Sequence, residues 1–284
     1  MKRVGGRAKM LRLLREVKGK ISQAFLDFIE RRKKRFTVKF MNDLYQAGGI
    51  TTALEYEISN ETAEFVTKEI IPVLKETAFM TYKRFKKEIE RKESPQEVPV
   101  SFQEHADSFI GIRGAELVVL LSASQKEAIR NVLKYEMQGK LSPYEAQKVI
   151  RQTIGLTPKE QQAVLRMLDA LVEEGVPRGT IFAQTLKYAD QLLKLRAERI
   201  ERTELAKAYN WSSHETMKDL IRRGLIKEPI RVWETAGDNR VCSVCSGNDG
   251  IKVKMEEAFP TGHSMPPIHP NCRCTIVYEI PEEV

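Results

Sequence analysis

The fold of the C-terminal part of the chain is decided by two short stretches, Cys242-Ser243-Val244-Cys245 and His269-Pro270-Asn271-Cys272-Arg273-Cys274. All four cysteines of the chain lie in them. A C-x-x-C turn presents two sulfurs to one tetrahedral ion, and a second pair of donors from a distant loop closes such a site. Five side chains compete for the four ligand positions: Cys242, Cys245, His269, Cys272 and Cys274. We predict a structural zinc site made from four of these five, with no open position for an activated water.

The segment around these residues needs such support. Residues 236–274 are rich in Gly, Pro, Asn and Ser and poor in large apolar side chains, so burial alone does not offset their ordering entropy. A zinc ion contributes on the order of 10 kcal/mol to the folding of a small module. Two alternatives stay open, namely reduced buried cysteines and disulfides formed in air. A redox role for the C-x-x-C pair lacks the βαβ context that it needs.

The cellular setting follows from the same cysteines and from the N-terminus. Arg12 and Arg15 interrupt the apolar residues near the start of the chain, so we expect no signal peptide. Cysteines confined to positions after 240 do not form the distributed framework of a secreted protein. We therefore expect the reducing cytoplasm of a cell. No apolar run approaches the roughly 18 residues of a membrane span.

Positive charge is concentrated in the first 40 residues. The whole chain has a formal net charge of +8, the first 40 residues carry +11, and the remainder sums to −3. A basic segment binds phosphates because their neutralisation releases counterions. We take one run as the candidate nucleic-acid-binding element: Arg31, Arg32, Lys33, Lys34 and Arg35. The alternatives are a solvated helix face and a contact for an acidic protein surface.

Helical patterns fill most of the chain. Apolar spacings of three and four predict helices over residues 8–47 and 60–93, with a kink or break at Pro72. Residues 94–99 form the best linker, and residues 117–121 fit a buried strand or a helix equally well. Three S/T-x-x-E patterns predict capping boxes that start three short helices, at Ser124, Ser142 and Thr157. A longer helix is expected over 178–210, and a further one over 212–223.

The last 55 residues have a different pattern. β-Branched and aromatic residues predict strands at 230–235, 251–253 and 275–278. The predicted fold class is therefore mostly α, with a helical N-terminal arm, a helical middle and a small α+β C-terminal module around the Cys/His centre. The predicted domains are residues 1–95, 100–195 and 196–284. No role is expected for His105, and His214 and His263 are expected at the surface or in a loop.

Several of these residues, in order and spacing, resemble the phage Mu F-like head-morphogenesis proteins. The stretch Arg199-Ile200-Glu201-Arg202-Thr203-Glu204 is similar to a helix motif of that family, and residues 269–274 are similar to its terminal motif. Between them lie further matching positions: Trp233, Asp238, Asp249 and Gly250. The resemblance covers residues 120–280 and is strong over 195–278. Glu201 departs from it, since many relatives carry Ala there; we expect this position to be exposed.

The resemblance implies a minor capsid protein of a tailed bacteriophage that is not an enzyme. It implies a few copies in the capsid interior, assembly in the host cytoplasm, association with the portal and other head proteins, and a role in DNA packaging or ejection. Contact with DNA is expected through the basic arm. Arg199, Arg202, Thr203 and Glu204 are then structural, with Arg202 or Glu204 bridging the helix to the cysteine loop.

Two other functions are alternatives. A toxin-like nuclease or transferase would use Arg202, Glu204 and His269, but residues 199, 202 and 204 do not share one helix face. A zinc-stabilised nucleic-acid-binding module unconnected with phage would bind through residues 230–284.

Overall fold

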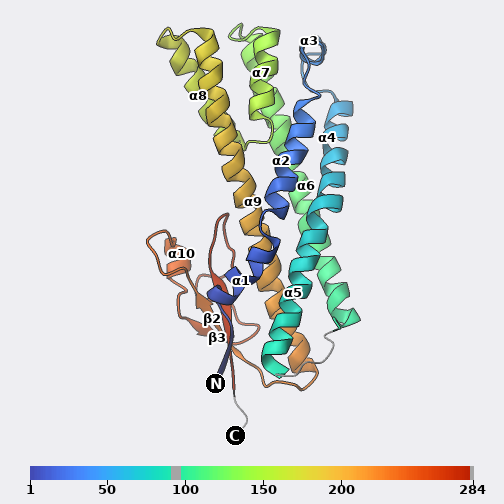
Figure 1. Ribbon diagram of the computed structural model, residues 1–284, viewed down its shortest axis with the longest axis vertical. Coiled ribbons are helices and arrows are strands. Elements are labelled where there is room, and N and C mark those ends of the chain that lie inside the picture. The colour runs from blue at the N-terminus through green and yellow to red at the C-terminus, as the bar shows by residue number, and fades with distance from the viewer. Residues whose placement is uncertain (91–96, 282–284) are drawn as a thin grey trace. The chain divides into compact units, whose positions relative to one another are not determined.

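The computed structural model describes residues 1–90 and 97–281. The predicted fold class is confirmed, because the chain is mostly helical and carries one small antiparallel sheet (Figure 1). Contacts divide the chain into two compact units. Unit 1 contains residues 1–20, 71–112 and 199–284, and unit 2 contains 21–70 and 113–198. Both units are thus assembled from separate stretches of sequence. The three consecutive domains derived from the sequence stay a prediction.

Unit 1 is built around the sheet. It contains β1 (Lys2–Gly5), α1 (Arg7–Val17), α5 (Ile71–Glu90), β2 (Ile230–Glu234), the short α10 (Ser243–Ser246), β3 (Lys252–Val253) and β4 (Thr275–Ile280), with parts of α6 (Val100–Met137) and α9 (Arg178–Arg222). The strand order is β1-β4-β2-β3, and every neighbouring pair is antiparallel. The second strand in this order, β4, is buried along its whole length. The hydrophobic core of unit 1 includes Leu13, Phe85, Tyr209, Trp233 and Tyr278.

The three predicted strands are confirmed, and a fourth was not foreseen. Lys2–Gly5 forms β1, and Lys2 pairs with Ile280 while Gly5 pairs with Val277. Val4 is fully buried in this strand. A four-residue basic strand has too little periodicity to be recognised in a sequence. The start of the chain is therefore part of the sheet formed by its C-terminal residues.

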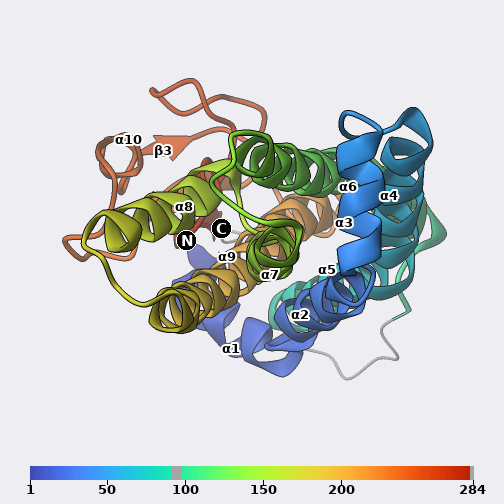
Figure 2. The ribbon, with the colours of Figure 1, turned by 90° about the horizontal axis from the view of Figure 1, so that it is seen from above.

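Unit 2 is helical. Its elements are α2 (Lys20–Lys33), α3 (Val38–Gln46), α4 (Thr52–Phe65), a π-helical turn (Val66–Ile70), α7 (Pro143–Thr153) and α8 (Pro158–Glu173), with the remaining parts of α6 and α9. Within this unit α3 contacts α7, and both are labelled in Figure 2. The predicted capping boxes of α7 and α8 are confirmed: Ser142 and Thr157 each accept from the N3 amide, while Glu145 and Glu160 accept from the cap amide.

Two predicted long helices are wrong in extent. Residues 8–47 form three helices, because Gly19 has a φ of 87° and Thr37 accepts from the Phe40 amide to start α3. The second helix begins earlier, at Thr52, and its regular α-helical pattern is interrupted by the π-helical turn just before Pro72, where the sequence predicts a kink or break. Residues 94–96 of the predicted linker lie outside the described residues, and residues 97–99 are in neither a helix nor a strand.

Two predicted helix boundaries are also wrong. Residues 117–121 and the predicted cap at Ser124 lie inside α6, where the Ser124 hydroxyl donates to the Leu120 carbonyl at 2.9 Å instead of accepting from an amide. The predicted helices 178–210 and 212–223 are one helix, α9. Within residues 1–90 and 97–281, no helix has the length and hydrophobicity to cross a bilayer.

Candidate metal centre

The first donor loop follows β2. Cys242 stands at the N-cap of α10, and its sulfur accepts from the Cys245 amide at 3.4 Å. This is the knuckle geometry expected of a C-x-x-C turn, with the sulfur facing the start of a helical turn. Earlier in the loop, Asp238 makes two hydrogen bonds with Arg273, at 2.6 and 2.5 Å. Because Arg273 lies in the second donor loop, this bidentate pair fastens the two loops together.

The second donor loop is fixed to α9 by Asn271. The Asn271 backbone N–H donates to the Thr203 hydroxyl at 3.2 Å, and the Asn271 side-chain oxygen accepts from Arg202 at 2.9 Å. Asn271 has a φ of 63°, a left-handed conformation that asparagine tolerates. The adjacent His269 donates from Nδ1 to the Pro270 carbonyl at 2.8 Å, which leaves Nε2 free to act as a ligand.

All five predicted donors come together, in two overlapping groups. One group is Cys242, Cys245 and His269, the other is Cys245, Cys272 and Cys274, and within each group the donor atoms lie within 4.8 Å of one another. Cys245 is shared. His269 Nε2 lies 3.2 Å from the Cys242 sulfur and 3.7 Å from the Cys245 sulfur, and the Cys245 and Cys272 sulfurs are 3.7 Å apart. Zinc bond lengths in a tetrahedron give about 3.8 Å between sulfurs and about 3.5 Å from sulfur to nitrogen.

The thiols of the cluster differ in acidity. The Cys274 thiol and amide donate to Cys272 and, against the effect of burial, lower the pKa of Cys272 to about 5. Partial burial raises the pKa of Cys242, but hydrogen bonds from Cys245 and the nearby His269 outweigh it, and the net shift is downward. The pKa of Cys245 is raised to about 12, first by burial and then by its sulfur neighbours. The thiols of Cys242 and Cys272, one in each donor group, therefore ionise more readily than the thiol of the shared Cys245.

The cluster has space for an ion and not for a substrate. Its donors line a hollow of about 10 Å³ together with Ala236, Arg240, Val241, Asn271 and Arg273, which is about the space of one water molecule. Cys245, Cys272 and Cys274 are buried, and Cys242 and His269 are half-buried. The Cys/His cluster can therefore hold a metal ion with ligands supplied by the chain itself.

The motif of α9 has structural contacts. Thr203 and Arg202 bind Asn271, as described above, and Glu204 is 3% exposed. The expectation that Glu201 is exposed is wrong: Glu201 is buried, and its carboxylate accepts from the Gly19 amide at 3.0 Å. A residue that caps a turn 182 positions away cannot be recognised from local pattern.

The other motif positions hold the strand-loop junction after β2. Trp233 is fully buried and packs edge-on against Phe259, with ring centroids 5.0 Å apart. The Asp249 carboxylate accepts from the Thr235 amide at 2.8 Å, and the Gly250 amide donates to the Trp233 carbonyl at 2.9 Å. These bonds hold the residues that follow the first donor loop against the end of β2.

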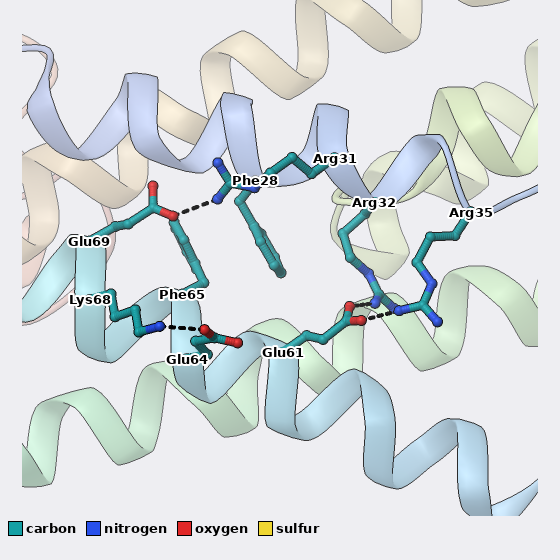
Figure 3. A pocket seen from close by; sticks show the side chains of 9 residues that line it. All are labelled: Phe28, Arg31, Arg32, Arg35, Glu61, Glu64, Phe65, Lys68 and Glu69. Carbon is teal, nitrogen blue, oxygen red and sulfur yellow. Dashed lines mark hydrogen bonds and ion pairs between the residues drawn. The ribbon is translucent and has the colours of Figure 1, made fainter.

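The predicted nucleic-acid-binding run lies beside acidic residues of unit 2. Figure 3 shows Arg31 paired with Glu69, and Arg32 and Arg35 both paired with Glu61. Arg32 is 3% exposed and also donates to Gln125. The stacked rings of Phe28 and Phe65 lie between these pairs, 4.3 Å apart. Lys33 pairs with Glu30, whereas Lys34 is exposed and has no ion pair within the described part of the chain.

The remaining histidines are separate from the cluster. His214 is buried, so the expectation of a surface position is wrong for it. His105 lies 3.4 Å from Glu215, and His263 contacts the Thr261 hydroxyl at 3.1 Å.

The fold and the cluster define a helical protein with a small α+β module that can hold a metal ion. Residues 166–277 match the family model described as Phage Mu protein F like protein, so this part of the chain is similar to the phage Mu F-like head morphogenesis family. The resemblance seen in the sequence is thereby confirmed over these residues, and the match supports a phage head-related protein. The matched range contains the α9 motif, the sheet strands β2 and β3, the first half of β4, and both donor loops. Neither the curated proteins nor the solved structures gave a match.

Proposed function

We propose that this chain is a minor head protein that acts by assembly rather than by catalysis, with a structural zinc ion in the Cys/His cluster. The observation that supports this most is the pair of donor triads sharing Cys245 in a hollow of about 10 Å³. Ligands supplied wholly by the chain leave no position for an activated water, which is the pattern of a structural site. When bound, zinc would hold together the two loops that Asp238 and Arg273 already join.

The absence of an enzymatic role is likewise a proposal. Arg202 is engaged by Asn271, Glu204 is buried, and His269 belongs to the Cys/His cluster. A nuclease or transferase would need these three groups to face one substrate. Replacement of Glu204 by Gln in the folded protein, with nuclease and transferase assays before and after, tests this. Activity that is lost in the variant without loss of folding would contradict the proposal.

The proposed partners are the portal, other head proteins and packaged DNA, in the capsid interior after assembly in the host cytoplasm. Lys34 is the cation of the basic run that remains available for DNA without breaking an ion pair. The other cations of the run would have to break their ion pairs with glutamates before they could bind phosphates.

The portal is the partner to test first. The portal protein of the same phage should co-purify with this chain in a defined ratio when the two are co-expressed. The zinc-loaded protein should be used, with Cys245→Ser as a variant whose Cys/His cluster is broken. If the wild-type protein and the portal elute separately at both low and high salt, the assembly role is wrong.

A further inference from the structure

Unit 1 contains a second hollow, far along the sequence from the Cys/His residues. It has a volume of about 450 Å³ and lies between α1, the end of α5 and the Tyr209 side chain of α9. We call it the α1–α5 pocket, and its lining residues are Lys9, Arg12, Leu13, Arg84, Phe85, Lys87, Glu88 and Tyr209. Four of these eight residues are cations, and one is a carboxylate.

The charges of the α1–α5 pocket are only partly compensated. Lys9 pairs with Glu88, and Arg84 pairs with Glu16. Arg12 and Lys87 are exposed and make no ion pair within residues 1–90 and 97–281. The pocket beside the basic run of unit 2 is different, because each of its four cations is paired with a glutamate, as Figure 3 shows. The α1–α5 pocket therefore has the unsatisfied positive charge that attracts an anion.

The inner side of the α1–α5 pocket is apolar apart from one hydroxyl. Leu13 and Phe85 are buried, and the Phe85 and Tyr209 rings meet edge-on at 5.9 Å. Tyr209 is 1% exposed, and its hydroxyl has no hydrogen-bond partner among the described residues. A buried hydroxyl without a partner costs about 1–3 kcal/mol. An acceptor brought by a ligand would remove that cost.

We propose that the α1–α5 pocket binds the phosphate group of a nucleotide. Arg12 and Lys87 contact the phosphate oxygens, Leu13 and Phe85 contact the apolar part of the sugar or base, and the Tyr209 hydroxyl donates to an oxygen of the ligand. The phosphate comes either from a free mononucleotide or from a nucleotide of a DNA strand. The second source rests on the DNA association proposed above.

The test compares two double variants that lose the same charge. Arg12→Gln/Lys87→Gln removes the free cations of the pocket, and Lys187→Gln/Lys194→Gln removes two exposed lysines of α9 that have no ion pair in the described chain. Binding of dAMP is measured by calorimetry, and binding of fluorescent single-stranded and double-stranded DNA by anisotropy. Two lost charge-assisted contacts should weaken dAMP binding about tenfold or more in the first variant, with a change of less than about twofold in the second.

Tyr209→Phe separates a binding role from a packing role. Removal of an unpartnered buried hydroxyl should leave thermal stability unchanged or slightly higher, while dAMP binding weakens about fivefold from the lost hydrogen bond. Unchanged dAMP affinity in this variant would exclude the hydroxyl from the site.

The outcomes distinguish the pocket from the proposed function. If the wild-type protein does not bind dAMP, or if both double variants weaken it equally, the α1–α5 pocket is not a nucleotide site. If dAMP binds as expected but DNA does not, the pocket stands and the DNA association in the proposed function is wrong.

Discussion

The Asn210 side-chain oxygen accepts a hydrogen bond from the Thr275 hydroxyl at 2.8 Å, and the same oxygen accepts from the Ile276 amide at 3.2 Å. Asn210 is 1% exposed, and Thr275 is fully buried. One residue of α9 thus supplies the acceptor for two buried donors at the start of β4. This bond sets where the strand that follows the second donor loop meets the helix.

Asn210→Ala should destabilise the protein by about 2–3 kcal/mol, because it leaves two donors buried without an acceptor. Chemical denaturation of the zinc-loaded protein measures this. Asn42→Ala, an exposed asparagine of α3, is the matched control and should change stability by less than about 0.5 kcal/mol. Equal, small effects of the two variants would show that the Asn210 bonds do not hold β4.

Anaerobically purified protein should contain about one zinc per chain. Cys245→Ser should lose the ion most completely, because Cys245 belongs to both donor triads. Ser243→Ala, in the same turn and exposed, should keep it. Elemental analysis and native mass spectrometry give the stoichiometry. Wild-type protein without metal, and with a thermal midpoint indifferent to a chelator, would contradict a structural zinc.

The same measurement identifies the ligand that is not used. If Cys274→Ser retains zinc and Cys242→Ser loses it, Cys274 is the unused donor and the other four residues of the cluster bind the ion. The reverse result makes Cys242 the unused donor. Retention of zinc in both variants would mean that neither sulfur is required.

Glu61→Ala should destabilise unit 2 by about 3 kcal/mol, the lower part of the range for a broken buried pair, because Arg32 is 3% exposed whereas Glu61 is partly exposed. Glu64→Ala on the same helix removes an exposed pair with Lys68 and should have little effect. Lys34→Gln should leave stability unchanged and is the variant for DNA binding. Equal stability of the two glutamate variants would show that the buried pair contributes nothing.

Stability should fall between pH 7 and pH 5 partly through His214. Burial, followed by the nearby Arg231, lowers the pKa of His214 to about 4, with Glu215, Glu256 and Lys218 also close. The unfolded chain takes up this proton near pH 6.5 and the folded chain does so only near pH 4, so acid favours unfolding in this window. The contribution at pH 5 is about 2 kcal/mol.

His214→Asn should therefore show a smaller loss of unfolding free energy between pH 7 and pH 5 than the wild-type protein. Denaturant titrations at both pH values give the comparison. Parallel pH profiles of wild type and variant would mean that His214 is not held neutral by burial.

The parts of the structure that the sequence predicts depend on short-range interactions. The caps at Ser142 and Thr157 were found because each box closes within four residues. The sequence predicts the five donors because the C-x-x-C and H-P-N-C-R-C stretches place sulfur and imidazole groups at spacings typical of metal ligands. Ser124 fits the same capping pattern, but inside α6 its hydroxyl binds the preceding turn, so the pattern alone was misleading.

The remaining features depend on partners far away in the chain. Nothing near Arg32 indicates that Glu61 pairs with it in the folded chain, so the run was interpreted by charge alone. The Glu201 carboxylate accepts from the distant Gly19 amide, and β1 is a strand only because β4 pairs with it. A neutral buried histidine such as His214 has no local signature either.

The pairing of β1 with β4 also constrains how the chain reaches its native state. Residues 2–5 are synthesised roughly 270 residues before their hydrogen-bonding partners at 277–280. Unit 1 therefore cannot close during most of translation, whereas the segments of unit 2 are all synthesised by residue 198.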